Sequence, residues 1–438
     1  MASTYLTRTF STNGNRKKFT VSVWVKKSQF ASGKAIWGSD DGSGYVWLIF
    51  GSTLYFQQNP SNSIEFNSTA KYRDVNGWYH IVQQVDTAQA TASNRMKFWI
   101  NGEQVTSWST ATYPSQNSDL NFTSSSEPIQ IGMYGSAYWD GSMSHFHWCD
   151  GYAYDASDFG ETDSTTGEWK IKTSPSVSYG SNGFFILKDG NSVTDQSGNT
   201  NNFTVAGGTL TKTEDNPSNV FATLNPLDVS AGTPAGLING NNTYNKTATG
   251  AGTNGARLAT IAPSSGKWYW EFKPADSVAL ILGFARTDHL NNTASLNGWI
   301  GQDVGAFGLV NGGDKIIAGS QTSESYGWTT NDIIGFAMDL DNHKFYAHKN
   351  GTYYNSGDPT SGATGTGAIG NITTGNNYAP WVQNNNYNAT NVVHCNFGNG
   401  YFGTTAVSSA GTNASGIGIF EYDVPTGYTA LSTKGLNE

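Results

Sequence analysis

Alternation of apolar and polar residues, interrupted by Asx-Gly dipeptides, is the feature that most constrains what this chain can fold into. The segments FTVSVWVKK (19–27), GWYHIVQQVD (77–86) and MKFWINGEQV (96–105) all alternate in this way. A period of two places successive side chains on opposite faces of a strand. Asx-Gly pairs such as Asn101-Gly102 favour tight hairpins, because both residues tolerate a positive φ. The pattern predicts an all-β protein, built from two antiparallel, jelly-roll-like β-sandwich domains.

Length, charge and composition narrow the function classes. The chain has 438 residues, enough for two sandwich domains, and a net charge of −9 without a basic block beyond Arg16-Lys17-Lys18. We therefore expect no nucleic-acid partner. No run of 18 apolar residues predicts membrane insertion, and the first residues, MASTYLTRTF, lack the apolar core of a secretory signal, so we expect synthesis in a cytoplasm. Cys149 and Cys395 lie too far apart to suggest a disulfide framework.

Shifts in composition predict four segments. Strand patterning fills residues 1–170 and gives way to a mixed connector with short strands at 171–228. A second sandwich is predicted at 229–410, after a stretch rich in Gly, Asn and Thr. The last piece, 411–438, is too apolar to extend freely into solvent, and we expect it to be a docking segment.

Both halves resemble known families. FTVSVWVKK, GWYHIVQQVD, NRMKFWINGEQV and IQIGMYGSAYWDGSMSHFHWCDGYAYDASDF occur in the order of a laminin-G/concanavalin-A-like sandwich, over roughly residues 3–165. GKWYWEF, NDIIGFAMDLDNHKFYAHKNG, YAPWVQ and NFGNGYF resemble a SPRY (B30.2-like) domain, over roughly residues 255–405. The second resemblance implies partner binding through loops and offers no catalytic residues to transfer.

The tandem of these domains is similar to virion surface proteins of marine bacteriophages. That resemblance implies a location on the virion. We expect a protein made in the host bacterial cytoplasm and placed on the virion surface, with other virion proteins as partners, a homo-oligomeric state (a trimer is favoured) and a host glycan as a possible ligand. Two roles fit: a short tail fibre or capsid fibre that attaches to a host glycan or receptor, or a capsid or tail decoration or connector protein that makes only protein contacts. We expect no enzyme. A polysaccharide depolymerase is less favoured, because ETDSTT at 161–166 lacks the last carboxylate of a glucanase E-x-D-x-x-E strand.

The stretch HFHWCDG carries potential metal ligands. His145, His147 and Cys149 share one face of the expected strand, and zinc prefers such ligands. In the laminin-G-like pattern, Phe146 and Trp148 on the opposite face point into the core. We therefore expect a structural strand whose His/Cys face points outward, towards solvent, the connector or a neighbouring subunit, with a metal site as the alternative.

Aromatic side chains in turn-rich segments are the candidate contacts for a glycan or a protein partner, since sugar CH faces pack on aromatic rings. A calcium site at a loop rim, held by Asp40, Asp41 and Asp140, is a weaker alternative, because hairpin turns alone explain these Asp residues. No other cofactor, and no catalytic residue, is expected. The contact candidates are Trp108, Tyr113, Tyr138, Trp139, Trp299, Tyr326, Trp328, Tyr353 and Tyr387.

Overall fold

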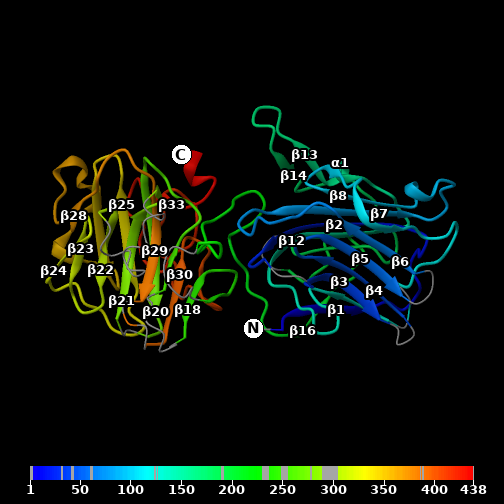
Figure 1. Cartoon of the computed structure of the whole chain (residues 1–438), viewed down its shortest axis with the longest axis horizontal. Helices are drawn as coiled ribbons and strands as arrows, with labels where there is room; N and C mark the ends of the chain where they lie inside the picture. The colour runs from blue at the N-terminus through cyan, green and yellow to red at the C-terminus, as the bar shows by residue number, and fades with distance from the viewer. Residues whose placement is uncertain are drawn as a thin grey trace. The chain divides into compact units, whose positions relative to one another are not determined.

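The chain forms two compact units in a computed structural model. The first unit comprises residues 1–212 and 216–218, and the second comprises residues 213–215 and 219–438 (Figure 1). The structure describes all residues except 1–2, 31–32, 41–43, 60–62, 123–124, 126, 189–191, 229–235, 248–254, 277–278, 289–303, 385, 387–388 and 438.

Two antiparallel sheets build the first unit. The eight-stranded sheet has the order β10 (Trp108–Thr112), β6 (Ile64–Ser68), β5 (Leu54–Asn59), β4 (Tyr45–Phe50), β3 (Ala35–Asp40), β11 (Pro128–Ile131), β1 (Tyr5–Thr9), β16 (Thr204–Gly207). The six-stranded sheet has the order β15 (Phe184–Ile186), β12 (Gly141–Asp150), β2 (Lys18–Lys27), β7 (Tyr79–Asp86), β8 (Met96–Ile100), β9 (Glu103–Gln104).

The core of this unit lies between the two sheets, as the alternation predicts. Odd-numbered residues of β2, such as Phe19 and Val21, are buried against residues of the eight-stranded sheet, such as Trp37. The expected core positions of Phe146 and Trp148 are confirmed, because both are buried in the same cluster. This burial of apolar area supplies the main favourable term for the sandwich.

Residues 171–228, predicted as a connector, divide between the two units. β15 pairs with β12 in the six-stranded sheet, and β16 pairs with β1 in the eight-stranded sheet. Both sheets are therefore completed by strands from this segment. β15 and β16 each form an edge strand of one sheet. Local sequence patterning does not predict with which strand each of them pairs.

A second layer covers part of the outer face of the six-stranded sheet. Residues 152–179, called the cover below, contain α1 (Ala156–Phe159), β13 (Gly160–Thr162) and β14 (Trp169–Ile171). α1 and the β13–β14 hairpin lie beside β7 and β8 (Figure 1). Ala156 and Phe159 pack with Val82 and Trp99 of the sheet in a small apolar cluster.

The His/Cys face of β12 lies on the outer side of the sheet and is covered by other parts of the chain. His145, His147 and Cys149 are only 8%, 2% and 0% exposed, so they do not point into solvent. Cys149 belongs to the apolar cluster under the cover, and the His147 ring stacks on Phe185 with centroids 3.9 Å apart. Of the three surroundings that the sequence left open, the structure shows the connector, because Tyr179 and Phe185, within residues 171–228, both contact His147.

The second unit is also a sandwich, so the all-β prediction is confirmed in both units. Its larger sheet has the order β17 (Gly236–Ile238), β18 (Thr243–Lys246), β30 (Asn391–Asn396), β20 (Lys267–Pro274), β25 (Ile334–Asp339), β26 (Lys344–Lys349), β27 (Thr352–Tyr353), with β28 (Gly370–Asn371) beside β26 and β33 (Thr429–Ala430) parallel to β20. The other sheet has the order β19 (Ala256–Leu258), β29 (Tyr378–Asn384), β21 (Leu280–Arg286), β22 (Ala306–Val310), β23 (Lys315–Ile317), β24 (Ser320–Thr322). β31 (Tyr401–Phe402) and β32 (Thr405–Ala406) form a separate hairpin.

The described part of the predicted docking segment, residues 411–437, packs on the second unit itself. Phe420 and Tyr428 are buried against Tyr269 of β20. The carboxylate of Glu271, on the same strand face, accepts the backbone N–H of Glu421 at 3.0 Å and the backbone N–H of Tyr422 at 2.9 Å. This segment therefore docks onto the unit that precedes it in the chain.

Candidate functional site

The open end of the outer face of the six-stranded sheet carries a cluster of polar side chains. The register places Lys18 of β2 opposite Asp86 of β7, and Gln84 of β7 opposite Lys97 of β8. Their neighbours Phe19, Val85 and Met96 point into the core, so the four polar residues share the outer face. The cover leaves this end of the sheet open.

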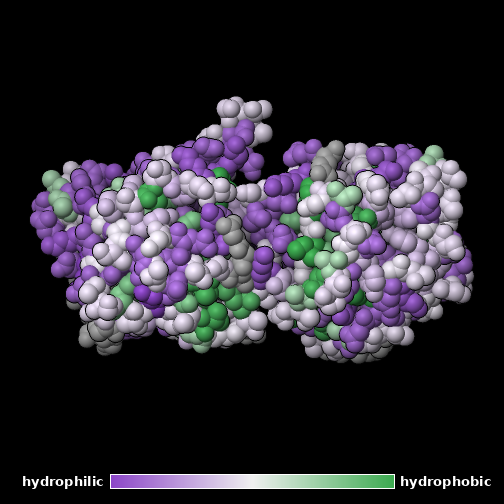
Figure 2. Space-filling model, turned by 180° about the vertical axis from the view of Figure 1, so that it is seen from behind, coloured by the Kyte–Doolittle hydropathy of each residue, from purple (hydrophilic) through white to green (hydrophobic). Residues whose placement is uncertain are grey.

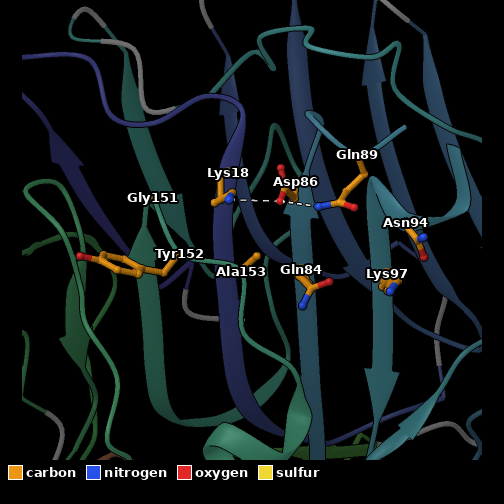
Figure 3. A pocket seen from close by; sticks show the side chains of 9 residues that line it. All are labelled: Lys18, Gln84, Asp86, Gln89, Asn94, Lys97, Gly151, Tyr152 and Ala153. Atoms are coloured by element: carbon orange, nitrogen blue, oxygen red, sulfur yellow. Dashed lines mark hydrogen bonds and ion pairs between the residues drawn. The ribbon is translucent and has the colours of Figure 1, made fainter. Parts of the chain in front are cut away.

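These residues line a pocket with a volume of about 440 Å³. Figure 3 shows Tyr152 on one side, Asn94 and Lys97 on the other, and Lys18, Asp86 and Gln84 between them. The complete lining consists of Lys18, Gln84, Asp86, Gln89, Asn94, Lys97, Gly151, Tyr152 and Ala153.

Hydrogen bonds and an ion pair connect several residues of the pocket lining. Lys18 Nζ lies 3.2 Å from Asp86 Oδ2, and Gln89 Nε2 donates to the same oxygen at 2.9 Å (Figure 3). Gln84 Nε2 donates to the carbonyl of Tyr154 at 3.0 Å. The Gln84 carbonyl and the Lys97 ammonium have no protein partner among the described residues, so both are available to a ligand.

An aromatic ring stands at the edge of the pocket. Tyr152 is 41% exposed, and its ring stacks on that of Tyr154, with centroids 5.9 Å apart and planes 12° apart. Thr20 Oγ1 donates to the Tyr152 carbonyl at 2.9 Å and accepts the Tyr154 N–H at 2.8 Å. The pocket therefore combines a positioned ring face with amide, carboxylate and ammonium groups.

The predicted contact residues of the first unit lie elsewhere. Trp108 and Tyr113 pack edge-on against Phe66, with ring centroids 5.1 and 4.9 Å apart. Tyr138 lies 6.2 Å from the ring of Tyr5, and Trp139 packs against the core. All four predicted residues are half-buried, and none lines the pocket.

Burial corrects two predicted contacts of the second unit. Tyr326 and Trp328 are only 5% and 4% exposed and belong to its core, so neither offers a ring face to a ligand. A turn-rich sequence around an aromatic residue does not reveal that the loop folds back onto the sandwich. Tyr353 is half-buried against His348, at 5.2 Å between ring centroids. Trp299 and Tyr387 lie outside the described residues.

The structure brings no metal-binding group together within the residues that it describes. There, no three His, Cys, Asp or Glu side chains are placed to hold a metal ion. Asp40 accepts the Tyr134 hydroxyl at 3.1 Å, and Asp140 accepts Ser28 Oγ and Gln29 Nε2. The third calcium candidate, Asp41, lies outside the described residues.

The His/Cys face of β12 packs against neighbouring side chains. His147 Nδ1 hydrogen-bonds the Tyr179 hydroxyl at 2.8 Å, and burial holds the pKa of His147 well below its ordinary value. Burial also raises the pKa of the Cys149 thiol, which keeps it protonated and apolar. Cys149 and Cys395 are both free and buried.

The pocket was missed in the sequence, although one signal for it exists. Tyr152 follows the Asp150-Gly151 turn, where the chain leaves the sheet. Exposed aromatic residues at such a point are candidate contacts, but the partners Gln84 and Lys97 come from strands that only the register brings together.

Among the residues that the structure describes, no helix is long and apolar enough to cross a membrane.

Comparison with known proteins identifies the type of the first sandwich. Residues 2–157 match the family model Laminin_G_3, described as the concanavalin A-like lectin/glucanases superfamily. This match confirms the concanavalin-A-like prediction for the first sandwich. No curated protein matches the chain.

Solved structures similar to the chain include the SPRY domain of human HERC1 (15% identity, 39% of this chain and 96% of the other, TM-score 0.30). A native heptameric SAP-like pentraxin from Limulus polyphemus is also similar (16% identity, 34% and 71% coverage, TM-score 0.25). A third is domain 4 of AbnA, a GH43 extracellular arabinanase from Geobacillus stearothermophilus, in complex with arabinotriose (16% identity, 32% and 64% coverage, TM-score 0.26).

Proposed function

We propose that this chain is a non-enzymatic binding protein of a bacteriophage virion surface, a short tail fibre or capsid fibre, and that it attaches to a host-surface glycan. The single observation that carries glycan binding is the polar pocket of about 440 Å³ with the exposed Tyr152 ring at its edge. The virion location is supported by the resemblance of the two-domain sequence to phage surface proteins.

The pocket suits a sugar on chemical grounds. The CH face of a sugar ring packs on an aromatic ring, and its hydroxyl groups both donate and accept hydrogen bonds. Tyr152 supplies the ring, Asp86 and the Gln84 carbonyl accept, and Lys97 donates. Because the pocket spans strands β2, β7 and β8, several of these groups can contact one ligand together.

A glycan array of bacterial surface polysaccharides tests this proposal. The full chain should bind a subset of the glycans, and Tyr152→Ala should weaken that binding about tenfold, which corresponds to about 1.4 kcal/mol. Phe30→Ala removes another exposed aromatic ring, outside the pocket, and should bind as the unchanged chain does. Binding that is unaffected by Tyr152→Ala would contradict the proposal.

The same experiment separates the two alternative roles. Release of new reducing ends from a bound polysaccharide would indicate a depolymerase. An absence of glycan binding, together with regular density for this chain over the capsid in cryo-electron microscopy of the virion, would favour a decoration or connector protein. Density at the tail tip or in a projecting capsid fibre is the result expected for the attachment role.

A further inference from the structure

We propose that the outer face of the eight-stranded sheet is a second glycan-binding surface, and that it takes an extended neutral polysaccharide. This inference deepens the proposed attachment function, but it depends on a different face of the first unit. Its central residues are Tyr45, Trp47, Tyr55 and Tyr134, called the aromatic face below.

The register of three strands places these side chains together. In β4 and β5, Tyr45 lies opposite Asn59 and Trp47 opposite Gln57. Tyr55 of β5 lies opposite Asn67 of β6. Residues such as Val46, Leu48 and Phe56 alternate with them and are fully buried, so the aromatic and amide side chains share the outer face. They are half-buried, which leaves part of each exposed.

Trp47 is the centre of the aromatic face. Its ring lies 4.8 Å from Tyr134, 5.7 Å from Tyr45 and 6.4 Å from Tyr55, each at a steep angle. Tyr134 reaches this position because Gly38 lies beneath it. A Cβ at Gly38 would lie 2.8 Å from the Tyr134 Cβ. The rings are therefore held in place before any ligand binds.

Polar groups around the rings are arranged for hydroxyl contacts. The Tyr45 hydroxyl donates to Gln57 Oε1 at 3.1 Å and accepts Asn59 Nδ2 at 3.4 Å. Among the described residues, the indole N–H of Trp47 and the Asn67 Oδ1 have no hydrogen-bond partner. Both atoms are buried, so the polar groups that a ligand can reach here belong to the partly exposed side chains of Tyr45, Gln57 and Asn59.

Charge selects a neutral ligand over an acidic one. β3, β4, β5 and β6 contain no Lys or Arg, while Asp40 and Glu65 supply carboxylates on their outer faces. A polyanion would meet repulsion here, whereas carboxylates accept hydrogen bonds from neutral sugars.

The size of the face favours a chain over a single sugar. Four adjacent strands span about 14 Å at the usual spacing of about 4.8 Å. The face of the molecule drawn in Figure 2 is mostly hydrophilic or neutral, with separate apolar patches.

Affinity electrophoresis of the full chain in gels containing dextran, galactomannan or alginate tests the proposal. A neutral polysaccharide, dextran or galactomannan, should retard the chain, and alginate should do so less. Trp47→Ala and Tyr55→Ala should each weaken retardation about tenfold, whereas Trp47→Phe, which keeps a ring, should retain most of it. Thr112→Ala, an exposed residue on edge strand β10, is the control for the same sheet.

The results of this test can be distinguished from the results of the test of the polar pocket. Thermal unfolding should show that all variants remain folded, and Phe30→Ala, which removes an exposed ring outside the pocket and the aromatic face, should leave retardation by the neutral polysaccharide unchanged. Failure of both dextran and galactomannan to retard the chain would overturn this inference, as would equal retardation of Trp47→Ala and the unchanged chain. A dimer in sedimentation that Trp47→Ala dissociates would identify a second copy as the occupant and would also overturn it. In each case, array binding that requires Tyr152 would leave the proposed function intact.

Discussion

The indole N–H of Trp169 donates to Nδ1 of His80 at 3.0 Å, and the two rings stack with centroids 6.0 Å apart. Since Nδ1 accepts, the ring proton of His80 resides on Nε2, which donates to Ser22 Oγ at 2.8 Å. One neutral imidazole thus connects β2, β7 and the β13–β14 hairpin. The contact anchors the cover at the end of β7 opposite to the pocket residue Asp86.

Acid should destabilise the first unit through His80. Burial lowers the pKa of His80 to about 3, below the 6.5 of an exposed histidine. The unfolded chain therefore binds a proton that the folded chain does not, so the stability from neutral His80 is present above about pH 6.5 and is lost as the pH falls towards 3. Urea unfolding at neutral pH and at about pH 4.5 should show a larger loss for the unchanged chain than for His80→Gln. Equal losses would contradict this role.

The Trp169 indole leaves no room for a side chain at Gly102, so a substitution there should destabilise the first unit. A Cβ there would lie 2.5 Å from Cε3 of the indole, and Gly102 has φ +83°. Gly167, at φ +75°, has no atom within 4 Å of its Cβ position and serves as the matched control for backbone strain. We expect Gly102→Ala to lower the free energy of unfolding by about 1–3 kcal/mol more than Gly167→Ala, because it adds a steric conflict. Denaturant midpoints of the two variants measure this difference.

The Glu271 carboxylate should hold the C-terminal segment, residues 411–437, against the rest of the second unit. Its carboxylate also accepts the Tyr269 hydroxyl at 3.0 Å and Asn396 Nδ2 at 3.2 Å, so all four partners donate. Glu271→Gln places an amide N–H₂ against such donors, and we expect a loss of about 1–3 kcal/mol. Hydrogen exchange of the peptide that contains Glu421 and Tyr422 should become faster. Unchanged protection of this peptide would show that the carboxylate does not hold the segment.

The pH dependence of Glu271 has the opposite sign to that of His80. Burial raises the pKa of Glu271 to about 7, although its hydrogen-bond donors act to lower it. The folded chain then binds the proton more tightly, so the stability from this group is present below about pH 4.5 and is lost as the pH rises to about 7. Urea unfolding of the second unit should show this slope for the unchanged chain, and Glu271→Gln should remove it.

Lys97 should favour acidic sugars in the polar pocket. Its ammonium has no protein partner in the described part of the chain, whereas Lys18 is paired with Asp86. Lys97→Gln should therefore weaken binding of uronate-containing glycans more than binding of neutral ones, and should reduce the salt dependence of binding. Titration calorimetry at two salt concentrations measures both effects. A uniform loss for all glycans would assign Lys97 a purely structural role.

The parts of the fold that depend on local period were predictable. Alternation places Phe146 and Trp148 on one face of the strand, and the laminin-G-like resemblance assigned that face to the core, a prediction that their burial confirms. Period alone does not say whether solvent, the connector or a neighbouring subunit meets the opposite face, so the sequence left these alternatives open. The structure places Tyr179 and Phe185 of the connector against His147.

The candidate site was less predictable because it depends on long-range register. Lys18, Gln84 and Lys97 come from three strands and meet at one end of a sheet face only after those strands pair. Turn signals likewise report local backbone conformation and not burial, which explains why Tyr326 and Trp328 were expected at the surface but lie in a core.

The most direct test of glycan binding by the pocket is a crystal structure of the full chain, from crystals soaked with the glycan that binds most strongly on the array. We predict a sugar ring against Tyr152, with hydroxyl groups in contact with Asp86, Gln84 or Lys97. A pocket that stays empty while the sugar binds elsewhere on the chain would contradict this prediction.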